Sequence, residues 1–104
     1  MKNSDSPWKH GALFICEKCG KRQDADPILM NFAIEVKEEF KLRLKSESIG
    51  KSVRVATSSC LSLCPPNKQV AAWCPSEGKM EMIELKASEK ETLFSWLKKK
   101  IANL

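Results

Sequence analysis

Four of the five cysteines in this chain fall into two closely spaced pairs that could do chemistry together. Cys16 and Cys19 form a C-x2-C pair, and Cys60 and Cys64 form a C-x3-C pair. The N-terminal segment has no apolar run long enough for a signal peptide, so we expect a cytoplasmic protein whose thiols stay reduced. In that compartment, short cysteine spacings favour a metal site or a redox site over structural disulfides.

Three kinds of site are compatible with these cysteines. A 2Fe-2S cluster takes four thiolates, so each local pair would hold one iron ion. Zinc (Zn2+) also accepts four thiolates, and the sequence CEKCGK at residues 16–21 resembles a zinc knuckle. A thiol-disulfide oxidoreductase would use Cys16 and Cys19 alone, which leaves the second pair without a role. Four converging thiolates repel one another unless a cation neutralises them, so we favour a metal, with the cluster as the leading interpretation and zinc as the alternative.

The two pairs are predicted to follow two neighbouring strands. The continuous apolar run Ala12–Cys16 is typical of a central strand buried on both faces. Val53 and Val55 alternate with polar residues in a second predicted strand, which ends just before Cys60. A helix should connect the two strands, so we expect a right-handed crossover and a parallel pair. Because parallel strands end at the same edge of a sheet, the two cysteine pairs should meet there.

The connecting helix is predicted to begin at Asp26 and Pro27. The Asp26 carboxylate can accept hydrogen bonds from free amides of the first turn, and Pro27 suits the first helical position. Apolar residues then recur every four positions and should face the sheet. They are Ile28, Phe32, Val36 and Phe40. Gly50 lies just past the expected end of this helix.

The second half of the chain predicts a hairpin and a closing helix. Strands expected over residues 69–74 and 79–85 flank the turn-forming sequence PSEG, so they should pair antiparallel. Ser88 and Glu91 match a capping box at the start of the second helix. The apolar stripe of this helix should cover the sheet and not the first helix. The expected fold is therefore α/β, in the order β-α-β-β-β-α, with a mixed four-stranded sheet covered by two helices.

The composition is that of one small globular domain. The chain has 104 residues, of which 42% are apolar and 30% charged, which suits one core. We expect residues 1–9 to form a flexible tail and residues 10–104 a single domain. The net charge of +5 comes from cations that are dispersed apart from Lys98–Lys100, so we expect an acidic partner surface and no nucleic acid. No segment is apolar enough to span a membrane.

Several segments together carry a resemblance to a known family. They are ICEKC at the end of the first strand, ATSSCLSLC at residues 56–64, VAAW at 70–73 and CPSEGK at 74–79. In this order the chain resembles the thioredoxin-like 2Fe-2S ferredoxins, which include the small iron-sulfur subunit of respiratory NADH dehydrogenases. It resembles even more closely small bacterial metal-binding proteins with C-x2-C after the first strand and C-L-S-x-C later. The resemblance covers residues 11–101.

The resemblance implies a fold, a ligand set and a function. The fold would be thioredoxin-like, and Cys16, Cys19, Cys60 and Cys64 would bind the 2Fe-2S cluster, whereas Cys74 would not. Cys74 is the reserve ligand if Cys19 does not bind. The protein would pass single electrons to a redox partner with an acidic docking face, without being an enzyme itself, and a homodimer is left open. A zinc-binding structural or interaction module that uses the same four cysteines is the alternative.

Overall fold

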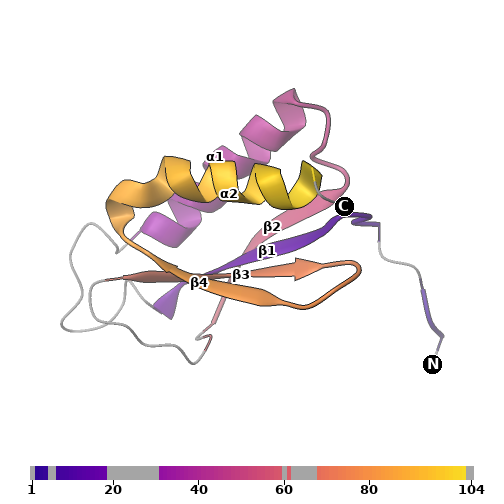
Figure 1. Cartoon of the computed structure of the whole chain (residues 1–104), viewed down its shortest axis with the longest axis horizontal. Coiled ribbons are helices and arrows are strands. Elements are labelled where there is room, and N and C mark those ends of the chain that lie inside the picture. Colours follow the sequence, from indigo (N-terminus) through magenta and orange to yellow (C-terminus); the bar gives the residue numbers. More distant parts are fainter. Residues whose placement is uncertain (1, 5–6, 19–30, 60, 62–67, 103–104) are drawn as a thin grey trace.

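The computed structural model describes residues 2–4, 7–18, 31–59, 61 and 68–102. These residues form a two-layer α/β structure in which both helices lie on the same side of one sheet (Figure 1). The strands are β1 (Gly11–Cys16), β2 (Val53–Ser58), β3 (Gln69–Pro75) and β4 (Glu81–Leu85), and the helices are α1 (Phe32–Ser46) and α2 (Lys90–Ala102). The predicted α/β fold with a mixed four-stranded sheet and two helices is confirmed, and the arrangement is consistent with a thioredoxin-like layout.

The sheet has the strand order β2-β1-β3-β4. As predicted, β1 and β2 are parallel neighbours, and their register places Cys16 opposite Ser58. The hairpin of β3 and β4 is antiparallel, also as predicted, and β3 pairs antiparallel with β1. The carboxyl ends of β1 and β2 and the first residues of β3 therefore lie at the same end of the sheet.

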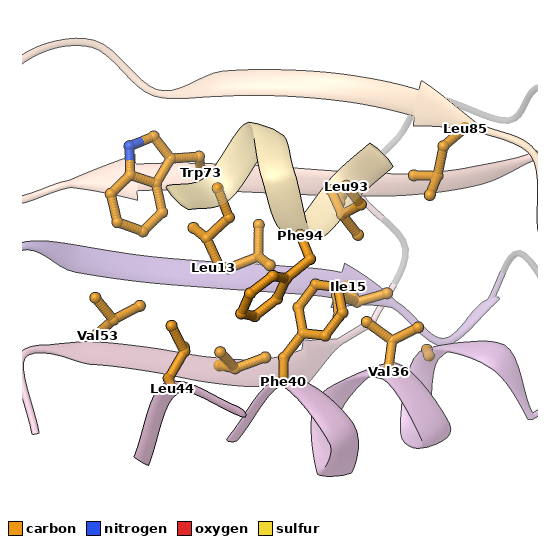
Figure 2. Packing of buried hydrophobic residues seen from close by; sticks show 14 of the residues in the cluster. Leu13, Ile15, Val36, Phe40, Leu44, Val53, Trp73, Leu85, Leu93 and Phe94 are labelled. Carbon is orange, nitrogen blue, oxygen red and sulfur yellow. The ribbon is translucent and has the colours of Figure 1, made fainter. Parts of the chain in front are cut away.

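The main core lies between the sheet and the two helices (Figure 2). Strand residues alternate between the two faces, so Leu13 and Ile15 of β1 belong to this core while Cys16 belongs to a smaller cluster. The helices contribute the apolar stripes expected from the sequence, and Trp73 of β3 is buried with them. The stripe residues of the two helices in this core are Phe32, Val36, Phe40, Leu44, Leu93, Phe94 and Leu97.

The two helices also contact each other, which corrects the expectation that they would cover the sheet alone. The ring centroids of Phe40 and Phe94 are 4.9 Å apart in an edge-to-face arrangement, which is a favourable aromatic geometry. The Arg43 guanidinium lies 3.7 Å from the centroid of the Phe94 ring. The physical reason is that α1 and α2 share one face of the sheet and are therefore neighbours.

Helix α2 begins at another residue than the sequence suggested, whereas the predicted start of the first helix lies outside the described residues. Helix α1 begins at Phe32, after a turn at Asn31 whose carbonyl accepts the first helical hydrogen bond. Asp26, Pro27 and Ile28 lie outside the described residues. The predicted capping box at Ser88 and Glu91 is wrong.

The chain coils immediately after β4, in a 3-10 turn over Ala87–Glu89 that precedes α2. There the Lys86 backbone N–H donates to the Glu89 carboxylate at 2.8 Å, so Glu89 caps the turn. Glu91 accepts from Arg43 of α1 instead.

Helix α1 ends without a glycine in the left-handed position that usually follows a helix. Ser48 takes this conformation, with φ of 62°. The Ile49 N–H donates to the Leu44 carbonyl at 3.0 Å, and the Ser48 N–H donates to the Lys45 carbonyl at 3.1 Å. These hydrogen bonds turn the chain from α1 toward β2.

Two residues of the expected tail contact the domain. The Ser76 hydroxyl donates to the Lys9 carbonyl at 2.6 Å, and the Arg54 guanidinium lies 5.7 Å from the ring centroid of Trp8. That residues 1–9 form a flexible tail and residues 10–104 the domain stays a prediction.

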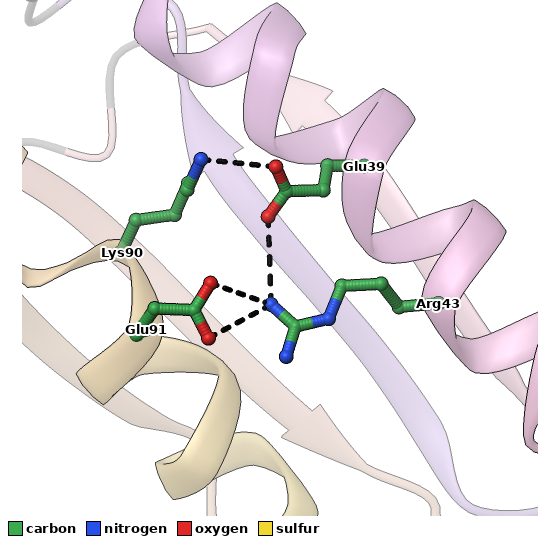
Figure 3. Close-up of polar contacts among 4 residues, drawn as sticks. All are labelled: Glu39, Arg43, Lys90 and Glu91. Atoms are coloured by element: carbon green, nitrogen blue, oxygen red, sulfur yellow. Dashed lines mark hydrogen bonds and ion pairs between the residues drawn. The ribbon is translucent and has the colours of Figure 1, made fainter.

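A small network of charges joins α1 to α2 (Figure 3). Arg43 donates to both carboxylate oxygens of Glu91, at 2.8 and 3.0 Å. Lys90 donates to Glu39 at 2.9 Å. The hydrogen bond from Lys90 is the main reason why the pKa of Glu39 is lowered, and it outweighs the desolvation that would raise that pKa.

Replacing Glu39 with glutamine should make stability less sensitive to acid. Because its pKa is lowered in the folded state, ionised Glu39 stabilises the fold above its unfolded-state pKa, and this contribution is lost as the pH falls through the folded-state pKa. We expect a loss below about 1 kcal/mol at neutral pH, since the Glu39 side chain is 38% exposed and solvent screens its ion pairs. Urea unfolding at about pH 7 and pH 3 checks this. A loss of the same size at both pH values, or an equal effect of Glu38→Gln, would contradict it.

Candidate metal centre

Of the four predicted ligands, Cys16 lies within the described residues, and Cys19, Cys60 and Cys64 lie outside them. Cys16 is the last residue of β1. Its thiol is free and its side chain is only 1% exposed. The structure thus places one predicted ligand at the end of the sheet where the parallel strands β1 and β2 finish.

The backbone around Cys16 is held by the strands on both sides. Toward β2, the N–H of the next residue, Glu17, donates to the Ser58 carbonyl at 2.9 Å. Toward β3, the Gln69 side-chain amide donates to the Cys16 carbonyl at 2.6 Å and to the Val70 carbonyl at 3.0 Å. These bonds fix the position at which the chain leaves β1 after Cys16.

Leu61 connects the second cysteine pair to this edge. Its partly buried side chain packs against the cluster formed by Cys16 and Val70, as does Met82 of β4. Cys60 is bonded directly to Leu61, and consecutive Cα atoms are only about 3.8 Å apart. Leu61, the residue that follows Cys60 in the sequence, therefore lies against the end of β1.

Cys74 lies at the other end of the sheet, which corrects its assignment as the reserve ligand. It pairs with Ala12 in β1, whereas Cys16 is at the opposite end of that strand. At about 3.3 Å per residue, roughly 13 Å separate the two positions. The antiparallel direction of β3 causes this separation. Burial also raises the pKa of the Cys74 thiol, which disfavours the thiolate that binds metal.

Within the described ranges, no three His, Cys, Asp or Glu side chains gather closely enough to hold a metal ion. His10 lies just before Gly11 and so at the opposite end of β1 from Cys16. The four-cysteine ligand set itself stays a prediction.

Gln69 is the residue of this edge that sequence reasoning missed. It is fully buried, and both of its N–H groups are used by backbone carbonyls, which fixes the orientation of the amide. Its Oε1 is the one buried side-chain oxygen or nitrogen among the described residues without a hydrogen-bond partner. A buried acceptor without a donor costs about 1–3 kcal/mol. The available signal was a glutamine at the head of the apolar run QVAAW.

Comparisons of this chain with protein-family models, curated proteins and solved structures found no match. None of the helices in the described part of the chain has the length and apolar character needed to cross a membrane.

Proposed function

We propose that this protein is a ferredoxin-type electron carrier that binds one 2Fe-2S cluster through Cys16, Cys19, Cys60 and Cys64. The packing of Leu61 against Cys16 and Val70 is the observation that carries the proposal. It brings the segment next to Cys60 to the end of the strand that bears Cys16. The parallel register of β1 and β2 supports the same meeting point.

The residues at this edge fit a thiolate-bound metal group. Cys16 offers a free sulfur at the end of a strand that is paired on both sides. Val70, Leu61 and Met82 pack around it and would limit the access of water. When bound, the cluster would supply a centre that accepts and releases one electron.

Charge indicates the kind of redox partner. The chain carries a formal net charge of +5, and an oxidised 2Fe-2S cluster with four thiolates adds about −2. The loaded protein would remain positive by about three charges. We therefore propose a partner protein with an acidic docking face, which would favour encounter at low ionic strength.

The burial of Cys16 disfavours a catalytic dithiol. An attacking thiolate must reach its substrate, and reactive cysteines are usually partly exposed at a helix N-terminus. Cys16 is 1% exposed, and the described helix α1 begins only at Phe32. Zinc bound by the same four cysteines is the competing assignment. The metal and sulfide content of the purified protein distinguishes it from a 2Fe-2S cluster.

Metal and sulfide analysis tests the proposal. We expect the full chain, purified without oxygen or reconstituted with iron and sulfide, to contain about two iron ions and two acid-labile sulfides. Visible absorption and the paramagnetic resonance spectrum of the reduced protein should show the cluster. Stoichiometric zinc without sulfide, even after attempted reconstitution, would overturn the proposal and establish the zinc module.

A further inference from the structure

A pocket of about 930 Å³ opens beside β2, away from the cysteines. Its apolar lining includes Leu44 at the end of α1 and Val53 and Val55 of β2, which belong to the main core. Figure 2 shows Leu44 and Val53 at the same end of that core. Trp8, with 37% of its surface exposed, also lines the pocket.

The pocket is centred on the outer edge of the sheet. Strand β2 is the outermost strand on its side. Val53 and Val55 point into the core on the helix face, so Arg54 between them points to the other face, yet all three line the pocket. A pocket lined by residues of both faces of an outer strand lies along the edge of that strand.

The backbone of β2 offers hydrogen-bonding groups at this edge. The carbonyls of Ser52 and Ser58 accept hydrogen bonds from the side of β1, at 2.9 Å from His10 and Glu17. Successive residues of a strand direct their backbone groups to alternate sides. Those of Val53, Val55 and Thr57 therefore point away from β1, toward the outer edge.

The charge around the pocket has one sign. Among the described residues that line it, the charged ones are Lys41, Lys45, Lys51 and Arg54, and no Asp or Glu accompanies them. All four are exposed, and none forms an ion pair among the described residues. By contrast, Lys90, Lys98 and Lys100 are each paired with a glutamate. A ligand with acidic groups is the natural complement.

We propose that this pocket binds an extended acidic segment of a partner protein, which adds to the sheet as a fifth strand beside β2. Its backbone would pair with Val53, Val55 and Thr57, as in strand addition to an open sheet edge. Its acidic side chains would meet the four cations, and an apolar side chain would rest on Trp8, which lines the pocket with 37% of its surface exposed.

The pocket, which supplies the charged and apolar contacts, lies away from the end of the sheet that bears Cys16. Val53 lies at the opposite end of β2 from Ser58, which pairs with Cys16. At about 3.3 Å per residue the two ends are roughly 16 Å apart. Peptide binding should therefore not require metal, and the two proposals can fail independently.

Synthetic peptides test the proposal with the full chain at low ionic strength. The main probe is an acetylated peptide of about eight alternating Glu and Val residues, a typical strand length. Its counterparts are an alternating Lys and Val peptide and the Glu and Val peptide with every backbone nitrogen methylated, which cannot form the strand hydrogen bonds. Amide chemical shifts and hydrogen exchange of Val53, Val55 and Thr57 report binding at the edge.

We expect the acidic peptide alone to bind and to slow exchange at those three amides. The double variant Lys45→Glu/Lys51→Glu should weaken binding about tenfold, because two attractions become repulsions. The matched variant Lys79→Glu/Lys99→Glu changes the same net charge at exposed positions outside the pocket and should stay within about twofold.

Other outcomes would overturn the proposal. Equal binding of the methylated peptide would exclude strand addition, and equal binding of the lysine peptide would exclude charge recognition. Tighter binding of a dT oligonucleotide of the same charge would identify a nucleic-acid surface instead. If the acidic peptide does not bind, the proposal is wrong, and the four cations are explained as protection of the edge strand β2 against aggregation.

Discussion

Replacing Gly11 with alanine is expected to lower the free energy of unfolding by about 3 kcal/mol or more. Gly11 begins β1 with φ of 144°, a conformation that side chains rarely adopt. An added Cβ would lie 2.4 Å from the Cys74 carbonyl oxygen and 2.8 Å from the Cα of Pro75. Both atoms belong to the backbone of β3, which pairs with β1 at this point and has little freedom to shift.

A second glycine provides the matched control. Gly78 also has a positive φ, of 109°, but an added Cβ there would meet only the Pro75 ring, at 3.8 Å. Gly78→Ala should therefore cost only the backbone strain, about 1 kcal/mol. Urea unfolding followed by tryptophan fluorescence compares the variants. Equal losses for both would show that the close approach of β1 to β3 does not constrain residue 11.

Replacing Cys16 with serine should abolish metal binding by the full chain. Thiolates are the preferred ligands of iron-sulfur clusters and of structural zinc, whereas a serine hydroxyl stays protonated at neutral pH and binds these metals weakly. The measurement is iron, sulfide and zinc per chain after identical anaerobic purification. Far-ultraviolet circular dichroism establishes that the variant is folded, because Cys16 is buried in a well-packed site.

Cys74→Ser is the control for this experiment and should keep the full metal content. Cys74 is half-buried in the same sheet, but the strand register places it at the opposite end from Cys16. Cys60→Ser and Cys64→Ser should lose metal as Cys16→Ser does. Loss of metal from Cys74→Ser to the same extent would refute the ligand assignment.

The strands were the most predictable part of the fold. The continuous apolar run of β1 and the alternation of Val53 and Val55 in β2 reflect how each strand is buried, so sequence alone locates them. The position of Cys16 beside the end of β2 follows from the rule that neighbouring parallel strands finish at the same end of a sheet. The position of Cys16 at the end of β1, beside the end of β2, could therefore be predicted from the sequence.

Features set by tertiary contacts were not predictable. The sequence does not reveal that β3 pairs with β1, and this register separates Cys74 from Cys16. It also does not reveal that both helices share one face of the sheet, which brings Phe40 against Phe94.

Local motifs were ambiguous in a similar way. Ser88 and Glu91 match the capping pattern in sequence, but the turn begins earlier, and Glu89, three residues after Lys86, accepts the hydrogen bond from the Lys86 N–H. Gln69 was overlooked because a glutamine is normally exposed, and only its two hydrogen bonds to the backbone explain its burial.

The central position of β1 has a consequence for how the chain folds. This strand comes first in the sequence, yet Gly11 pairs with Val53 on one side and with Pro75 on the other. Long loops must close before either pairing forms, which places folding in the range of about milliseconds to seconds. During synthesis the uncharged segment Gly11–Cys16 leaves the ribosome long before its partners, and such segments aggregate readily. The speed of synthesis and the supply of chaperones should therefore influence the yield of native protein more than small changes in its equilibrium stability.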